Sequence, residues 1–197
     1  MPDLDRYLDI RSASGGASVA GGSTVVFVTN ITGVPQAWSV PAGGGWATQL
    51  TFADQRVGGV TASPTDPDLV VFSRDSGGNE RMQLHAVDPR GFGERDLVVD
   101  PAVIHRFGDF GPDGSWFVFC DNRRNGVDFD LYLRTPGGGE RLIAQLPGWN
   151  SIAEVSPDGG SVLVGHYESN VDSSVWLVAL AVGPGQHGVD VVERSHG

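Results

Sequence analysis

The 197-residue chain lacks lysine entirely, so all 13 of its basic residues are arginines, and they stand against 24 acidic residues. The formal net charge is −11, and no stretch of the sequence concentrates the arginines into a basic stripe. An acidic surface is repelled by phosphate backbones and by anionic lipids. We therefore expect neither nucleic acid nor a membrane among the partners of this protein.

Cysteine and long apolar runs are also scarce. The single cysteine, Cys120, lies in the run WFVFC, which excludes an intrachain disulfide and predicts a buried thiol. No segment approaches the ~18 consecutive apolar residues of a membrane-spanning helix. The opening MPDLDRYLDI is acidic and has no apolar core of a signal peptide. These absences predict a reducing, cytoplasmic location.

Glycine, in contrast, is abundant, with 29 residues, and 12 prolines accompany it. Neither follows the three-residue period of collagen. Both fall between short apolar runs, as turn residues do in all-β proteins.

A repeat organises the chain. Four stretches, at 19–30, 62–75, 110–122 and 155–167, each combine a turn with an apolar strand, and Ala20, Pro64, Pro112 and Pro157 fall in register at spacings of 44, 48 and 45 residues. Three of the four turns contain proline and aspartate, and two read Pro-Asp-Gly. Proline fixes φ, aspartate bonds the backbone that follows it, and glycine accepts positive φ, so this sequence suits a tight turn between strands.

Further strands follow in every repeat. A second strand is predicted at 36–40, 82–87, 130–134 and 175–180, and a closing strand at 48–52, 95–99, 141–146 and 189–193. Four short strands in about 45 residues are typical of one propeller blade. The sequence thus predicts an all-β partial β-propeller of about four blades of four antiparallel strands, forming an open arc or half ring. We expect an N-terminal lead-in at 1–12 and a propeller portion at 13–197, with blades at 13–57, 58–103, 104–150 and 151–193.

Several segments carry a more specific resemblance. The stretch FSRDSGGNERMQLHAVD, together with QLTFADQRV at 49–57 and IHRFGDFGPDG at 104–114, resembles the N-terminal propeller of the prolyl oligopeptidase family of serine peptidases, in particular its acylaminoacyl-peptidase and dipeptidyl-peptidase-like branch. The resemblance runs from residue 4 to about 180. It implies a propeller that restricts access to a C-terminal α/β-hydrolase domain, so that peptides reach the Ser-Asp-His triad and folded proteins do not.

The chain departs from that plan because it contains no G-x-S-x-G motif and no β-α-β alternation after the repeats. We therefore expect a chain truncated before the catalytic domain, which gates access for peptide substrates and is not catalytic by itself. Its partner would be the missing hydrolase domain or another protein. The alternative is a stand-alone TolB-like propeller that serves as a protein-binding scaffold.

No catalytic, metal or cofactor site is expected. No serine lies in a strained turn where a histidine could activate it, no two of the five histidines are spaced i, i+4, and there is only one cysteine. The carboxylates Asp121, Asp128 and Asp130 are expected in a solvated turn, with Arg123 and Arg124 offsetting their charge. Repeated aromatic residues are interpreted as core, namely Phe27, Trp38, Phe72, Trp116, Phe119 and Trp176.

The turn Gly-Gly-Asn-Glu at 77–80 is interpreted mainly as hairpin geometry, in which the glycines supply positive φ, Asn79 tolerates the left-handed region and Glu80 returns the chain. A role facing the substrate cavity or the hydrolase stays open for this loop. Six residues are candidates for a cleft or domain interface, in which arginines clamp carboxylates: Asn79, Glu80, Arg81, His105, Arg106 and Arg123.

Overall fold

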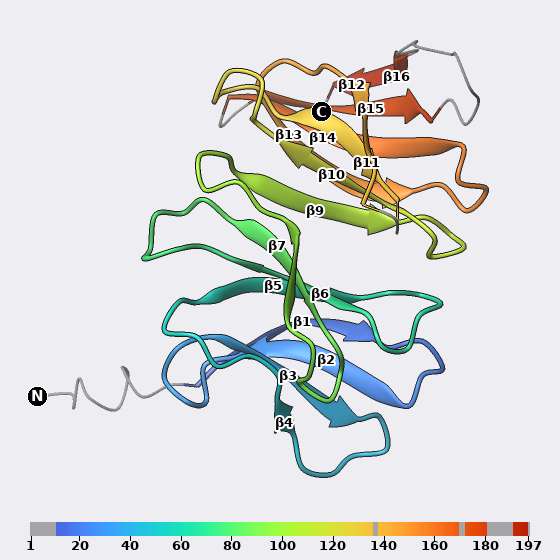
Figure 1. Cartoon of the computed structure of the whole chain (residues 1–197). Coiled ribbons are helices and arrows are strands. Elements are labelled where there is room, and N and C mark those ends of the chain that lie inside the picture. Colours follow the sequence, from blue (N-terminus) through green and yellow to red (C-terminus); the bar gives the residue numbers. More distant parts are fainter. Residues whose placement is uncertain (1–10, 136–137, 170–171, 181–190, 197) are drawn as a thin grey trace, which may run out of the picture. The chain divides into compact units, whose positions relative to one another are not determined.

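The structure is a computed structural model that describes residues 11–135, 138–169, 172–180 and 191–196, and in these residues all regular elements are strands. Sixteen strands form four antiparallel sheets of four, each in sequence order (Figure 1). The first sheet contains β1 (Ala13–Ser18), β2 (Thr24–Thr29), β3 (Gln36–Pro41) and β4 (Thr48–Gln49). The second contains β5 (Val57–Ala62), β6 (Val70–Arg74), β7 (Gln83–Val87) and β8 (Arg95–Val98).

The other two sheets follow the same plan. The third contains β9 (His105–Phe110), β10 (Phe117–Asp121), β11 (Asp130–Arg134) and β12 (Glu140–Ala144). The fourth contains β13 (Trp149–Val155), β14 (Ser161–Ser169), β15 (Asp172–Ala179) and β16 (Val191–His196). The prediction of an all-β partial propeller built from repeated four-stranded sheets is confirmed. Residues 1–10 of the expected lead-in, and residues 189–190 of the last expected strand, lie outside the described residues.

The turns between first and second strands form as the sequence predicts. In the third sheet, Asp113 accepts a hydrogen bond from the Ser115 backbone N–H at 3.0 Å, and Gly114 has a φ of 65°. In the fourth, Asp158 accepts one from the Gly160 N–H at 2.9 Å, and Gly159 has a φ of 70°. The aspartate thus orders the backbone after the turn, and the glycine takes the left-handed conformation that a side chain would oppose.

The predicted closing strand at 48–52 is longer than the observed β4, which ends at Gln49. The hydroxyl of Thr51 accepts the Ala37 backbone N–H at 3.0 Å, in place of a ladder carbonyl. The same hydroxyl donates to Gln36 Oε1 at 2.8 Å, so a side-chain network replaces the ladder there.

A buried polar residue at the start of each of three third strands holds the connection to the next sheet. Gln36 donates to the backbone carbonyls of Ala53 and Gln55 at 2.9 and 3.0 Å. Gln83 donates to the Val103 carbonyl at 2.9 Å, and Asp130 accepts the Leu146 N–H at 2.9 Å. A buried polar group without a partner is destabilising, and these connections satisfy it while they fix the path of the chain.

Every first strand has a bulge that shifts its register against the second strand. The shift falls between Ser14 and Gly16 in β1, between Val57 and Gly59 in β5, and between Ile152 and Glu154 in β13. In β9, Asp109 pairs with Val118 and Phe107 pairs with Phe119, so Gly108 is the extra residue. The repeat therefore extends to a backbone irregularity that the apolar pattern does not reveal.

The described residues form two compact units, each with its own core. The first unit comprises the residues up to Asn79 together with His85–Arg95, and the second comprises Glu80–Leu84 and the residues from Asp96 onward. The core of the first unit includes Val26, Val70 and Phe72, and that of the second includes Val118, Leu131 and Val164. Of the aromatic residues expected in the core, Phe72, Phe119 and Trp176 are buried, whereas Phe27, Trp38 and Trp116 are half-buried.

Within the second unit, the first strands of its two complete sheets lie against each other. The Val155 backbone N–H of β13 donates to the Asp109 carboxylate of β9 at 3.0 Å. Gly108 approaches Ile152 so closely that a Cβ added at Gly108 would lie 2.6 Å from the Ile152 Cβ. These contacts bring β9 and β13 together, and the candidate site is built on these two strands.

Candidate functional site

Strand β9 presents two adjacent candidate residues in different surroundings, because successive side chains of a strand point to opposite faces. His105 is 1% exposed and lies opposite Asp121 in the β9–β10 register. Arg106 is opposite Cys120, is partly exposed and contacts an aromatic ring of β13. The two residues therefore belong to separate clusters.

The first cluster is a buried charge network. His105 Nδ1 lies 3.2 Å from Asp121 Oδ2, and the Arg123 Nε donates to the same oxygen at 2.7 Å. Arg123 also binds Glu140 at 2.9 Å, and Glu140 binds Arg134 at 2.7 Å. The structure thus brings together His105 and Arg123, which the sequence nominated separately, through an aspartate that is fully buried.

The network sets the ionisation of its members. Burial acts to raise the pKa of Asp121, but the hydrogen bonds from His105 and Arg123 outweigh it and hold the pKa below its ordinary value. Burial acts to lower the pKa of Arg123, and the hydrogen bonds to Asp121 and Glu140 raise it instead. Asp121 is therefore a carboxylate and Arg123 a cation at neutral pH.

A cavity of about 290 Å³ lies beside this network, and its lining includes His105, Arg123, Glu140 and Asp100. The Nε2 atom of His105 is buried and has no hydrogen-bond partner among the described residues. A histidine held by an aspartate forms two parts of a catalytic triad, but nucleophilic catalysis also requires a hydroxyl or thiol at the second ring nitrogen. That third group is missing from the described residues around His105.

The burial of Asp121 and Asp130 differs from the solvated turn that the sequence predicted. Asp130 is fully buried, where a solvated turn was expected, and its Oδ2 accepts the Arg124 Nε at 2.7 Å. Asp121 is equally buried, so the expectation was wrong for both residues. Arg124 does offset the charge, because it also binds Asp128 at 2.9 Å. The two carboxylates are buried since each begins or ends a central strand, where the ladder keeps water away.

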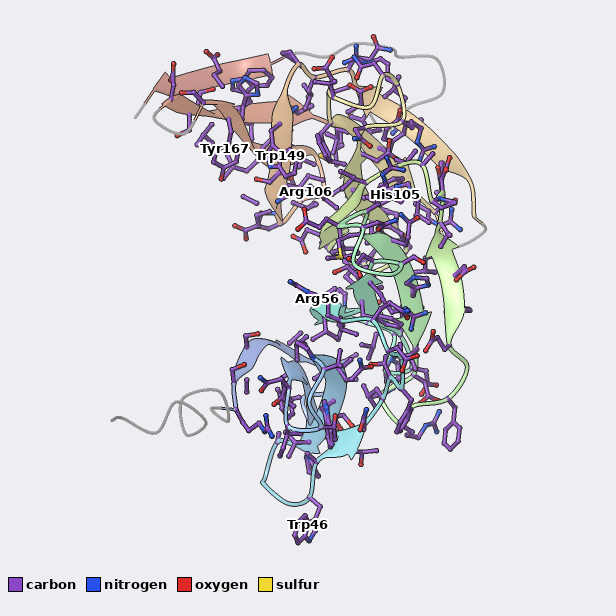
Figure 2. The ribbon with its side chains drawn as sticks, turned by 90° about the vertical axis from the view of Figure 1, so that its left-hand side faces the viewer. Trp46, Arg56, His105, Arg106, Trp149 and Tyr167 are labelled. Atoms are coloured by element: carbon purple, nitrogen blue, oxygen red, sulfur yellow. The ribbon has the colours of Figure 1, made fainter. Side chains whose placement is uncertain are left out.

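The second cluster surrounds Arg106 on the other face of β9. The Arg106 guanidinium lies over the ring of Trp149, 4.7 Å from its centroid. Trp149 packs against Phe129 with a centroid distance of 4.5 Å and pairs across the sheet with Tyr167. Trp149 and Tyr167 remain 43% and 48% exposed. Figure 2 shows Arg106, Trp149 and Tyr167 grouped on the same side of this unit.

These residues line an open pocket of about 800 Å³, which Glu168, Ser169, Asp172 and Ser173 complete. We call it the Arg106 pocket. It combines one guanidinium, two exposed aromatic rings and two carboxylates, all from β9 and from one end of the fourth sheet. The sequence analysis nominated Arg106 but missed Trp149, Tyr167 and Asp172. Strand pairing within the fourth sheet and the packing of β9 against β13 bring these residues together from segments up to 66 positions apart (106 to 172).

The Gly-Gly-Asn-Glu turn has the expected glycine geometry, with one correction. Gly77 and Gly78 have φ of 64° and 76°, but the left-handed residue after them is Glu80, with a φ of 61°, and Asn79 is not left-handed. Asn79, Glu80 and Arg81 are exposed. Arg81 donates to the Pro101 carbonyl at 3.3 Å, and both residues belong to the second unit.

Other classes of site are missing from the described part of the chain. Its His, Cys, Asp and Glu side chains form no group of three that could hold a metal ion. The described residues also contain no helix with the length and apolar character to cross a membrane.

Comparison with known proteins gives the fold. No family model and no curated protein matches the sequence. Among solved structures, an oligogalacturonate lyase in complex with manganese is similar over 92% of this chain, with a TM-score of 0.73 and 14% identity. TolB from Acinetobacter baumannii is similar over 92%, with a TM-score of 0.66 and 18% identity. Prolyl oligopeptidase B from Galerina marginata is similar over 94%, with a TM-score of 0.66 and 11% identity.

All three contain β-propellers, so the likeness places this chain in the propeller class. The chain spans 53% of the lyase, 43% of the TolB chain and 26% of the oligopeptidase. At these identities the likeness extends to the fold alone, and the function is a separate question.

Proposed function

We propose that this chain is the access-controlling propeller portion of a serine peptidase of the prolyl oligopeptidase family, and that it carries no catalytic residues of its own. Its role would be to admit peptides to an active site on an α/β-hydrolase domain and to exclude folded proteins. Two lines support this function: the resemblance of the Gly-Gly-Asn-Glu, Gln-Leu-Thr-Phe and His-Arg-Phe-Gly segments, and a fold shared with the propeller of prolyl oligopeptidase.

The observation that carries the non-catalytic part of this proposal is the state of the histidines. His105 is held by Asp121, yet its Nε2 contacts no nucleophile among the described residues. His166 uses Nδ1 for Asn150 at 2.8 Å, and its Nε2 lies 3.7 Å from Glu168. Neither of these two histidines contacts a serine among the described residues, which supports acyl transfer on another domain.

A propeller that works with a hydrolase must also contact peptides, and the Arg106 pocket offers the chemistry for that. It is open to solvent and large enough for two or three residues of a peptide. Its rings and its guanidinium suit apolar side chains and carboxylates.

Two measurements test the proposal. The purified chain should not hydrolyse chromogenic peptide or acyl-amino substrates above the blank, and turnover that survives repurification and is abolished by a serine-directed inhibitor would refute the non-catalytic role. The coding region downstream should contain a hydrolase reading frame with a G-x-S-x-G motif. When this chain and the hydrolase are produced together, they should cleave short peptides. They should leave a folded protein that contains the same peptide sequence intact.

A TolB-like scaffold is the second candidate, and one observation favours it. Three large apolar side chains of the first unit are strongly exposed, namely Trp46 at 96%, Phe52 at 77% and Phe92 at 69%. Trp46 projects from the loop between β3 and β4 (Figure 2), and Phe52 follows β4. Large exposed apolar side chains mark a protein-binding surface where they gather into one patch. An unrelated gene downstream would favour this candidate over the peptidase.

A further inference from the structure

Three arginines of the described residues lie over aromatic rings, and two of them are also paired with a carboxylate. Arg74 lies over Phe72 and binds Glu94 at 2.8 Å. Arg123 lies over Tyr132 and is paired with Asp121. Arg106 lies over Trp149, yet no carboxylate, carbonyl or hydroxyl of the described residues binds its guanidinium.

The stack fixes how this guanidinium can act. A planar guanidinium that lies over a ring satisfies one of its faces, and its five N–H groups remain directed outward in its own plane. Trp149 also packs against Phe129, with a centroid distance of 4.5 Å, and Phe129 is 1% exposed. Arg106 is thus a preorganised donor without a bound acceptor among the described residues, and it suits a planar anion such as a carboxylate.

The rest of the pocket indicates what the carboxylate is attached to. Trp149 and Tyr167 are cross-strand neighbours with nearly half of each ring surface exposed, so they offer a flat apolar platform beside Arg106. Glu168 and Asp172 line the same pocket and add negative charge to it. A ligand of matching chemistry carries a carboxylate, an adjacent apolar or aromatic group and a cationic group some distance away.

We propose that the Arg106 pocket binds the free C-terminal end of short peptides, with Arg106 on the terminal carboxylate and the rings of Trp149 and Tyr167 against the last side chain. In a di- or tripeptide, the N-terminal ammonium then faces Glu168 and Asp172. An acidic sugar chain also combines carboxylates with faces that stack on aromatic rings. It carries one negative charge per residue, however, and Glu168 and Asp172 repel it. This inference rests on the proposed peptidase function and names the end of the peptide that the propeller recognises.

The test is a titration of the full chain followed by NMR. The sequence contains five tryptophans, so five indole N–H signals are expected, and the signal that Trp149→Phe removes is that of Trp149. Ala-Ala-Phe is the probe, Ala-Ala-Phe amide removes only the terminal charge, and trigalacturonate represents the acidic sugar chains. Ala-Ala-Phe should shift the Trp149 signal in a saturable manner, and the amide should bind at least about tenfold more weakly, as expected for the loss of one charge-assisted hydrogen bond.

Variants separate the pocket from a general charge effect. Arg106→Gln should weaken binding of Ala-Ala-Phe about tenfold and bring it to the level of the amide. Arg106→Lys keeps the charge but not the planar arrangement of N–H donors. Its affinity for Ala-Ala-Phe should lie between those of the parent chain and Arg106→Gln. Arg74→Gln is the matched control, because Arg74 also stacks on an aromatic ring but already binds Glu94, and it should leave the titration unchanged.

The proposal is overturned if the amide binds as well as the free acid, if Arg106→Gln binds like the parent chain, or if trigalacturonate binds more tightly than the peptide. Should Arg106→Gln fail to fold, the acid–amide comparison on the parent chain and Arg106→Lys decide the question. The titration needs no hydrolase. Peptide binding without a downstream hydrolase would therefore refute the proposed function alone, and an intact hydrolase frame without peptide binding would refute this site alone.

Discussion

Gly108, the bulged residue of β9, offers a direct test of how the third and fourth sheets pack. An added Cβ at this position would lie 2.5 Å from Ile152 Cδ1, 2.6 Å from its Cβ and 2.8 Å from its Cγ2. Ordinary van der Waals contacts begin near 3.4 Å, so Gly108→Ala forces the two strands apart or distorts the bulge. Rotation of Ile152 about χ1 moves Cδ1 and Cγ2 but leaves Cβ in place, and the side chain alone cannot relieve the clash.

The expected magnitude follows from overpacking of a close contact. Insertion of one methyl group into a packed interface destabilises by about 1–3 kcal/mol. The separation also strains the adjacent hydrogen bond from the Val155 N–H to Asp109, which joins the same two strands at 3.0 Å. We place Gly108→Ala in the upper half of that range, which lowers Tm by about 4–12 °C for a chain of this size.

The assay is urea unfolding, followed by circular dichroism, of Gly108→Ala, of one control variant and of a double-mutant cycle with Ile152. Gly59→Ala is the matched control, because Gly59 lies in the first strand of another sheet and an added Cβ would meet only the Ser73 Oγ at 3.8 Å. It should stay within about 0.5 kcal/mol of the parent chain. Ile152→Gly removes the opposing Cβ, so the double variant with Gly108→Ala should be at least about 1 kcal/mol more stable than the sum of the single effects.

Additive single effects, or equal stability of the Gly108→Ala and Gly59→Ala variants, would refute the reasoning. Either result would mean that β9 and β13 are not in direct contact at this point.

Three further predictions concern the charge network, the thiol and the hairpin. Because the folded-state pKa of Asp121 lies below its unfolded value, its ion pair contributes stability above about pH 5 that is lost as the pH falls below about 4. Asp121→Asn should therefore lower the free energy of unfolding by about 2–4 kcal/mol at pH 7 and by much less at pH 3, and a pH-independent difference would contradict this. Cys120 is fully buried, and burial raises the pKa of its thiol to about 12. It should therefore react with a thiol reagent at pH 8 only at the rate at which the chain unfolds. Rapid labelling would contradict this and show that the third sheet is open. Glu80→Gly should stabilise the chain by up to about 1 kcal/mol, because it removes the steric strain of a left-handed residue that has a Cβ. Gly78→Ala should destabilise the chain by about as much, as measured by urea unfolding. Effects of the opposite sign would contradict the hairpin geometry.

The fold was accessible from the sequence because its signals are local and repeated. Pro-Asp-Gly turns and apolar runs recur at nearly constant spacing. The second and third strands of the second and third sheets are buried on both faces, so they read as continuous apolar segments. The runs before Asp121 and after Asp130 are of this kind. The first strands were placed only by the blade boundaries, since ASGGAS and HRFGDF are too polar and too rich in glycine to be recognised as strands.

The candidate site was only partly accessible. An arginine can be nominated from its residue type and its neighbours in the chain, as Arg106 and Arg123 were. Whether such a residue is buried depends on strand register, and a single-residue shift reverses it. The sequence therefore gave no sign that Asp121 and Asp130 are buried, or that Arg106 and His105 serve different clusters.

By itself, the sequence determined the repeated sheet, its tight turns, the buried thiol and the absence of a local catalytic motif, because each depends on residues within a few positions of one another. Tertiary structure alone decided that Arg106 lies over Trp149 and shares a pocket with Tyr167, and that His105 binds Asp121 with no nucleophile beside it among the described residues. Those contacts join strands whose pairing and bulges are set by packing across whole sheets, and no short-range pattern in the chain encodes them.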